Sequence, residues 1–181
     1  MGVAGTGKTA VGERLARCLG VPFLEGDDFH PRHNVEKMSS GIPLDDADRW
    51  PWLDAIGAAI RDTDKPPVVS CSALKRIYRK RLAATAGRPL VFLFLDASRE
   101  TLAGRLAARR GHFMPPGLLD SQIAMLEKPA PDEVAIRISI EPPLNAVVDD
   151  AVATLGACLL RQRSPHEADG KSGEADALST D

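Results

Sequence analysis

The chain begins with a glycine-rich segment, GVAGTGKT, at residues 2–9. This segment matches the pattern G-x-x-x-x-G-K-[S/T], in which closely spaced backbone N–H groups and a helix N-terminus surround phosphate oxygens. The residues that follow have apolar side chains at Val11, Leu15 and Leu19, a spacing that predicts the required helix. A glycine-rich turn that only caps a helix is the alternative. The helix at the right position favours a phosphate-binding loop.

The residue types of this loop each suit one contact with a nucleotide. Glycines let the backbone come close to phosphate oxygens, Lys8 can reach the β- and γ-phosphates and act in catalysis, and the Thr9 hydroxyl can bind Mg²⁺. The motif therefore predicts a nucleotide and Mg²⁺ as ligands. The nucleotide-binding residues predicted in the loop are Gly2, Ala4, Gly5, Thr6, Gly7, Lys8 and Thr9.

In phosphate-loop folds a buried β-strand leads into the loop, whereas only Met1 precedes it here. That strand lies in the interior of the sheet, so its loss removes a row of hydrogen bonds and the packing of two faces. Such a loss should exceed the ~5–15 kcal/mol by which a typical domain is stable. We therefore expect the coding sequence upstream of Met1 to encode a short segment rich in Val, Ile and Leu.

Predicted strands and helices alternate along the remaining chain. Short apolar segments predict strands at 21–24, 68–70, 90–95 and 135–140. Apolar side chains at helical spacing predict helices at 8–19, 49–61, 76–84, 99–108, 119–126 and 143–161. This alternation predicts a three-layer α/β/α fold of the phosphate-loop class, with a parallel sheet whose first strand is largely missing. Residues 31–48 are polar and irregular in pattern.

The composition bounds the number of domains and excludes several classes of protein. We predict one domain over residues 1–163 and a disordered polar tail at 164–181, which has almost no large apolar residues. A net charge of −2 and few aromatic residues argue against a nucleic-acid partner. Neither a long apolar run nor a leader segment is present, and the cysteines lack C-x-x-C spacing. We therefore expect no membrane partner and a cytoplasmic location.

An acidic turn follows the predicted strand at 21–24. Its carboxylates, Asp27 and Asp28, come at the carboxyl end of that strand, where parallel sheets bind ligands. A kinase needs such a carboxylate to orient the acceptor hydroxyl or to accept its proton. Polar and cationic side chains farther along suit a small, polyhydroxylated anion as acceptor. These are His30, Arg32, His33, Asn34, Lys37, Arg49, Lys75, Arg76 and Arg79.

Each of these charged side chains also has a simpler explanation. Most charged residues lie on the solvated surface, and Asp27-Asp28 can be an ordinary turn. The pair His30 and His33 could bind a metal ion, but the sequence has no third ligand at a useful spacing. The pattern alone leaves the role of the acidic turn open.

A basic segment, RLAARRGHF, ends one of the predicted helices. It places Arg105 and Arg109 four residues apart on one helical face, and Gly111 follows as a break. Phosphoryl-transfer enzymes use arginines of a mobile segment to neutralise charge on the transferred group. A solvated helix end, which favours cations, is the alternative. Beside a phosphate loop, we favour a lid in which Arg105 and Arg109 contact the nucleotide and Arg109 acts in catalysis.

Six segments carry a resemblance to a known family: GVAGTGKT, FLEGDDFHPRHNVEKMSSGIPL, DRWPWL, CSALKRIYR, RLAARRGHFM and LLDSQIAMLEKP. Together, from Met1 to about Leu160, they resemble the gluconate kinase family of the shikimate-kinase-like phosphate-loop kinases. The resemblance implies transfer of the γ-phosphoryl group of ATP to the 6-hydroxyl of D-gluconate, with Mg²⁺, to give 6-phosphogluconate. It also implies a parallel sheet in the order 2-3-1-4-5 and, often, a homodimer.

The resemblance implies roles for individual residues. Asp27 matches the catalytic acidic residue at the acceptor hydroxyl, and Arg109 matches the lid arginine. Glu25 stands where such kinases commonly carry an aspartate that helps to hold Mg²⁺ through water, beside the direct ligand Thr9. The substrate-side positions match Asp27, His30, Lys37, Arg49, Lys75 and Arg79.

Two alternatives to a gluconate kinase stay open. Shikimate kinases resemble this scaffold, but they carry a glycine triplet after the third strand, where this chain has SCSALK. The other alternative is a truncated, non-catalytic fold. Turnover with gluconate, glucuronate or shikimate separates these possibilities.

Overall fold

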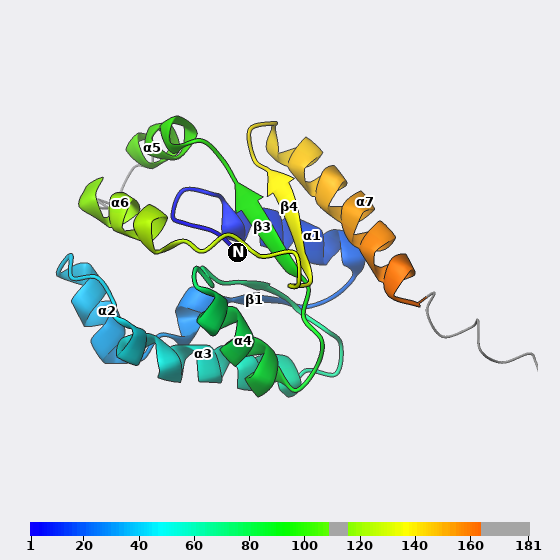
Figure 1. The fold of residues 1–181 in the computed structure, drawn as a ribbon, viewed down its shortest axis with the longest axis horizontal. Helices are drawn as coiled ribbons and strands as arrows, with labels where there is room; N and C mark the ends of the chain where they lie inside the picture. Colours follow the sequence, from blue (N-terminus) through cyan, green and yellow to red (C-terminus); the bar gives the residue numbers. More distant parts are fainter. Residues whose placement is uncertain (109–115, 164–181) are drawn as a thin grey trace, which may run out of the picture.

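The computed structural model describes residues 1–108 and 116–163 (Figure 1). The tail predicted at 164–181 lies outside these residues. Within the described part, no helix is long and apolar enough to cross a membrane. The elements are α1 (Lys8–Leu19), β1 (Phe23–Glu25), the short 3₁₀ helix η1 (Gly26–Phe29), α2 (Arg32–Ser39), α3 (Asp46–Arg61), β2 (Val68–Ser70), α4 (Arg76–Ala86), β3 (Phe92–Asp96), α5 (Arg99–Ala107), α6 (Pro116–Met125), β4 (Ala135–Ser139) and α7 (Leu144–Arg163).

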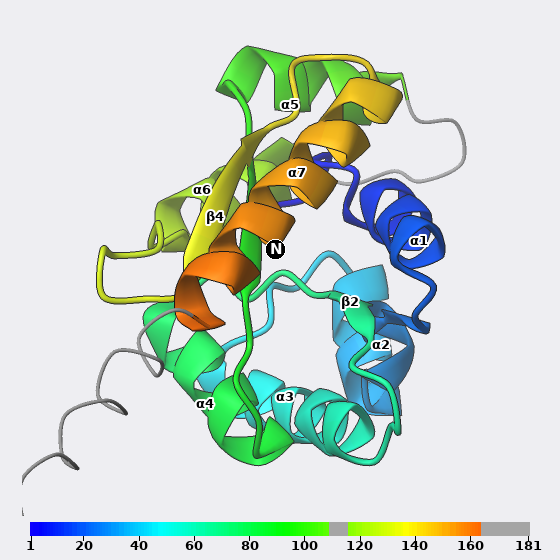
Figure 2. The same cartoon turned by 90° about the vertical axis from the view of Figure 1, so that its right-hand side faces the viewer.

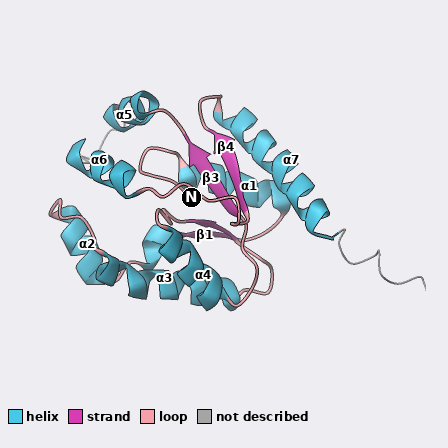
Figure 3. Cartoon of the chain, viewed as in Figure 1, coloured by secondary structure: helices cyan, strands magenta, loops and turns pink. Residues whose placement is uncertain are grey.

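The strands form two parallel pairs, and Figure 3 shows strands in magenta. In one pair, Phe23 of β1 lies opposite Val68 of β2. In the other pair, Phe92 of β3 lies opposite Ala135 of β4. Parallel strands point their carboxyl ends to the same edge, so the loops that follow β1 and β2 lie together.

Met1 and Gly2 lie between the two strand pairs. The N–H of Leu95 in β3 donates to the Met1 carbonyl at 3.0 Å, and the Met1 amino group donates to the Leu93 carbonyl. On the other side, the Gly2 N–H donates to the carbonyl of Ser72, just after β2, at 3.2 Å. Met1 and Gly2 therefore take the place of the middle strand, and the predicted order 2-3-1-4-5 is confirmed.

Helices cover both faces of the sheet and give the predicted three layers. On one face, α1 and α7 pack together and share an apolar core with β3 and β4. On the other face, α3 and α4 pack against each other and against β2. Figures 1 and 2 both show α3 and α4 side by side. Side chains of β3 divide between these cores, since Leu93 and Leu95 face the first and Phe92 the second.

Side-chain caps decide where several helices begin. Ser98 accepts a hydrogen bond from the Thr101 N–H and caps α5, as predicted. The helix α3 begins at Asp46, three residues before the predicted start, because Asp45 and Asp48 each accept a hydrogen bond from the other's backbone N–H. This reciprocal capping places two acidic side chains in the first turn of α3.

From the sequence, residues 31–48 are interpreted as irregular. This interpretation is wrong for Arg32–Ser39, which form the helix α2. This helix has a polar sequence, RHNVEKMS, and Asn34 is its one buried residue. A helix with so small a buried face shows no apolar repeat, which is why the hydrophobic pattern missed it.

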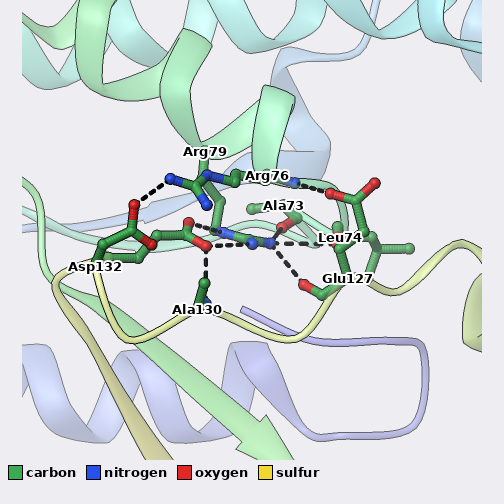
Figure 4. Close-up of polar contacts among 8 residues, drawn as sticks. Ala73, Leu74, Arg76, Arg79, Glu127, Ala130 and Asp132 are labelled. Atoms are coloured by element: carbon green, nitrogen blue, oxygen red, sulfur yellow. Dashed lines mark hydrogen bonds and ion pairs between the residues drawn. The ribbon is translucent and has the colours of Figure 1, made fainter.

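A buried ion pair joins α4 to the segment that follows α6 (Figure 4). The Arg79 side chain is 1% exposed and donates through Nε and Nη2 to the two carboxylate oxygens of Glu133, at 2.6 and 2.9 Å. Its Nη1 donates to the carbonyls of Ala73, Leu74 and Glu127. Because one guanidinium serves both segments, Arg79 holds the loop after β2 and the segment after α6 together.

The loop after β2 contains a residue in an unfavourable backbone conformation. Ala73 has a φ of 42°, in the left-handed region that costs an alanine about 1–2 kcal/mol. Its carbonyl accepts from Arg79, and the next carbonyl, that of Leu74, accepts from the Glu127 N–H at 2.9 Å. These hydrogen bonds offset the strain and set the path of the chain toward Lys75.

We predict that Glu133→Gln destabilises the fold strongly. The change leaves the Arg79 charge buried without its anion, and breaking a buried pair in this way costs about 3–5 kcal/mol in the free energy of unfolding. Urea titration followed by circular dichroism measures the loss. Asp132→Asn is the matched control, because Asp132 is 65% exposed and pairs with Arg76 at the surface. The control should lose less than about 1 kcal/mol, and equal losses would contradict the role of Glu133.

The same pair makes the stability depend on pH in acid. Hydrogen bonding from Arg79 lowers the pKa of Glu133 from 4.5 to about 2 in the folded protein. The unfolded chain takes up this proton at a higher pH, so the stabilisation is complete above about pH 4.5 and is lost toward pH 2. We expect the stability difference between the unmodified chain and Glu133→Gln to shrink over this range. A difference that stays constant would contradict the ion pair.

Candidate active site

The backbone of the phosphate loop turns at its glycines and leads into a helix, as the motif predicts. Gly5 and Gly7 have φ values of 83° and 78°, which glycine adopts without steric cost. Gly7 is the N-cap of α1, and no side chain caps the helix at this end. A Cβ added to Gly7 would meet no atom within 4 Å, so the space beside the helix N-terminus is open. Uncapped N–H groups next to open space are the features that an anion requires.

Three oxygen-bearing side chains meet near the end of β1, at the last residue of the phosphate-loop motif. The Thr9 hydroxyl donates to Oε2 of Glu25 at 2.7 Å, and the Ser70 hydroxyl donates to Oε1 of Glu25. A hydroxyl and a carboxylate are ligands that suit Mg²⁺, which takes few protein ligands when substrate phosphates supply the others. Within residues 1–108 and 116–163, no three His, Cys, Asp or Glu residues cluster to hold a metal ion. The pair Thr9 and Glu25 therefore fits Mg²⁺ bound together with a nucleotide.

The acidic turn is the helix η1, which is packed tightly against the end of β2. A Cβ on Gly26 would lie 2.1 Å from the Ser70 carbonyl oxygen, so only glycine allows this approach. The Trp52 indole N–H donates to the Gly26 carbonyl at 2.7 Å. The next residue, Asp27, has a side chain that is 76% exposed. A rigid turn thus presents the Asp27 carboxylate at the surface.

The His30 ring lies behind this carboxylate. It stacks on Trp52, with centroids 4.2 Å apart and an angle of 12° between the rings. Its Nε2 lies 3.9 Å from Oδ1 of Asp27, and its Nδ1 lies 3.3 Å from the amide nitrogen of Asn34. Burial, followed by the positive charge of Arg49, lowers the pKa of His30 from 6.5 to about 4. The ring is therefore neutral at neutral pH.

The two predicted lysines are each paired with a carboxylate from the first turn of α3. Lys37 donates to Asp48 at 2.5 Å, and this hydrogen bond lowers the pKa of Asp48. Lys75 donates to Asp46 at 2.6 Å, and the Tyr78 hydroxyl donates to the same carboxylate. These two hydrogen bonds, that of Lys75 first, lower the pKa of Asp46. Both lysines, which are predicted from the sequence to lie on the acceptor side, are thereby held in place by α3.

Arg49 lies near the Lys75–Asp46 pair, where the hydrogen bond from Lys75 is the largest of the causes that lower the pKa of Asp46 and the charge of Arg49 is the smallest. Arg49 is 8% exposed, and its guanidinium lies 5.6 Å from the centre of the Tyr78 ring. Its Nη2 donates to the Leu44 carbonyl at 3.4 Å, whereas its Nε has no hydrogen-bond partner among the described residues. The Arg49 guanidinium thus lies buried beside the Tyr78 ring, where one hydrogen bond, from Nη2 to Leu44, joins it to the described residues.

The structure brings most of the predicted acceptor-side residues into one network and leaves two predicted residues elsewhere. Asp27 lies close to His30, which stacks on Trp52 of α3. The same helix carries Arg49 and the two carboxylates that pair with the lysines. Arg79 lies apart, within the buried cluster around Glu133. The Arg105 guanidinium donates to the Ile140 carbonyl at the end of β4, at 2.5 Å. Arg109 lies outside the described residues.

Sequence reasoning missed three residues of the site: Asp46, Asp48 and Gln122. Asp48 carries a signal in the sequence, since Asp45 and Asp48 are spaced as a capping pair before an apolar run. Gln122 carries none. Its Oε1 accepts the N–H of Ala4 in the phosphate loop at 2.7 Å, a contact that depends on where α6 packs.

Comparisons with known proteins agree with this geometry. A family model described as an AAA domain matches residues 1–129. A gluconokinase of Gluconobacter oxydans is 49% identical over 155 residues, which cover 84% of this chain and 86% of the relative. The thermosensitive gluconokinase of Escherichia coli is 44% identical over 82% of this chain and 81% of its own.

Solved structures give the same assignment. The crystal structure of a gluconokinase from Sinorhizobium meliloti superposes with a TM-score of 0.82 at 47% identity, over 90% of this chain and 94% of its own. A shikimate kinase from Aquifex aeolicus superposes with a TM-score of 0.56 at 17% identity, over 88% and 96%, and so shows only the common fold. This chain belongs to the gluconokinase family of phosphate-loop kinases.

Proposed function

We propose that this chain transfers the γ-phosphoryl group of ATP to the 6-hydroxyl of D-gluconate, giving 6-phosphogluconate and ADP. The relatives named gluconokinases support the choice of substrate. One contact carries the proposal. Thr9 of the phosphate loop donates to Glu25 at 2.7 Å, and Glu25 lies two residues before Asp27. The nucleotide side and the acceptor side therefore meet across a single hydrogen bond.

The phosphate loop and Lys8 bind the nucleotide in this proposal. The N–H groups at the start of α1 and the Lys8 ammonium neutralise phosphate charge. The Thr9 hydroxyl would hold Mg²⁺, and Glu25 would hold it through water. Bound Mg²⁺ supplies further charge neutralisation on the β- and γ-phosphates. Arg105 and Arg109 are the arginines predicted to add positive charge; Arg105 donates to the Ile140 carbonyl in this structure, and Arg109 lies outside the described residues.

Asp27 acts on the acceptor hydroxyl. Its carboxylate orients the 6-hydroxyl and accepts its proton as the oxygen–phosphorus bond forms and the bond from the γ-phosphorus to the leaving ADP oxygen breaks. Lys37, Arg49 and Lys75 supply positive charge for the gluconate carboxylate. The hydroxyls of an open-chain sugar acid suit a site in which carboxylates and cations alternate.

We predict that the purified chain releases ADP only when ATP, Mg²⁺ and gluconate are all present. A coupled assay measures ADP release, and phosphorus NMR identifies a phosphate ester on the primary hydroxyl. Shikimate and glucuronate serve as competing acceptors. Turnover with shikimate but not with gluconate, or none with any of the three acids, would overturn the proposed function.

Asp27→Asn should lower kcat by about 100-fold or more, because the amide cannot accept the hydroxyl proton. The KM for ATP should stay within about threefold, since Asp27 does not contact the nucleotide in this proposal. The neighbouring exposed residue provides a matched control, Asp28→Asn, which should keep the kcat of the unmodified chain. Equal losses in kcat and in ATP binding for Asp27→Asn would mean that Asp27 has a structural role.

A further inference from the structure

The two nitrogens of His30 face different partners, and only one of them carries the proton of the neutral ring. Nδ1 lies 3.3 Å from Nδ2 of Asn34, whereas Nε2 lies 3.9 Å from Oδ1 of Asp27. Stacking on Trp52 holds the ring plane, and the His30 side chain is 5% exposed. The position of the proton decides whether His30 directs an N–H group or a lone pair toward Asp27.

The Asn34 amide determines where that proton lies. Its Nδ2 is 2.8 Å from the backbone carbonyl oxygen of Asp48. A carbonyl oxygen can only accept, so the nitrogen of the amide, and not its oxygen, must face Asp48. The same nitrogen, which carries two N–H bonds, also faces His30, so Nδ1 of His30 must accept the second one. The neutral ring then carries its proton on Nε2, toward Asp27.

Asn34 occupies this position at an energetic cost. The residue is fully buried, and its Oδ1 has no hydrogen-bond partner among the described residues. An unpaired buried acceptor costs about 1–3 kcal/mol, which an apolar side chain of similar size would avoid. What an apolar side chain could not supply is the pair of donors that face Asp48 and His30.

We propose that Asn34 is a positioning residue that fixes His30 in the Nε2–H tautomer and so directs an N–H group toward the Asp27 carboxylate. Its catalytic consequence rests on the proposed function, in which Asp27 accepts the proton of the acceptor hydroxyl. At 3.9 Å the Nε2–H group is beyond hydrogen-bond distance of the Asp27 carboxylate, so this group acts on the carboxylate as a neutral dipole and leaves its negative charge in place. A cationic imidazolium would instead stabilise the charged carboxylate and make it a weaker base. His30 therefore acts through Asp27.

The tautomer can be read directly by NMR. Long-range ¹H–¹⁵N correlation spectra of the labelled full chain, recorded at neutral pH without substrates, distinguish protonated from unprotonated ring nitrogens. The His30→Gln variant identifies the His30 signals by their loss. We expect a protonated Nε2 and an unprotonated Nδ1. A protonated Nδ1, alone or in an imidazolium, would overturn the proposal.

Two changes at Asn34 test its control of the tautomer. Asn34→Leu removes both donors, and Asn34→Asp keeps the shape but offers only acceptors, which draw a proton to Nδ1. We expect a mixed tautomer in the first variant, a protonated Nδ1 in the second, and a kcat lower by about tenfold in both. The KM for ATP should not change. The matched control is Asn145→Leu, at an exposed asparagine of α7, which should leave both the His30 tautomer and kcat unchanged.

Two results would count against Asn34 as a positioning residue. One is a folded Asn34 variant with an altered tautomer and an unchanged kcat. The other is an unaltered tautomer in both variants. The spectra of the unmodified chain need no substrate and no variant at Asn34, so they test the tautomer even if an Asn34 variant does not fold. A chain that shows the Nε2–H tautomer but does not phosphorylate gluconate would support the tautomer and contradict the proposed function.

Discussion

The sheet and the phosphate loop that leads from it depend on the backbone hydrogen bonds that Met1 and Gly2 make to both strand pairs. Leu95 in β3 and Ser72 after β2 bond to them from opposite sides, so two short parallel pairs become one sheet. The same residues join the two apolar cores, because Met1 packs against the α3–α4 side and Val3 belongs to the α1–α7 side. The phosphate loop starts at Gly2. Its direction toward the carboxyl edge of β1 and β2 therefore follows from these hydrogen bonds.

The helix α3 organises the acceptor side. Its first turn supplies Asp46 and Asp48 to the two lysines, and one turn later Trp52 holds both the Gly26 carbonyl and the His30 ring. Burial removes water from a charged group. The charge is then stabilised only when a counter-charge or a hydrogen bond takes the place of that water. Pairing of Lys37 and Lys75 with carboxylates of α3 meets this requirement within the chain itself. In the proposed function, an anionic substrate would enter a site whose cations are already positioned.

The sequence predicts the parts of this structure that rest on local pattern. The helix behind the phosphate loop has its predicted bounds, and the parallel sheet follows from alternating apolar segments. The helix α2 was missed because a polar surface helix has no apolar repeat. The position of Arg79 was not predicted either, because a cation four residues after Lys75 gives no sign in the sequence that it will be buried with Glu133. Contacts between distant segments, such as that of Gln122 with Ala4, are set by tertiary packing.

The central claim is that the phosphate loop and the acidic turn form one site for phosphoryl transfer. A crystal structure of the chain with a non-hydrolysable ATP analogue, Mg²⁺ and gluconate tests it most directly. The account predicts the 6-hydroxyl of gluconate within about 3 Å of the Asp27 carboxylate, in line with the bond to the leaving oxygen of the nucleotide. Gluconate bound away from Asp27, or with another hydroxyl facing the γ-phosphate, would contradict the account.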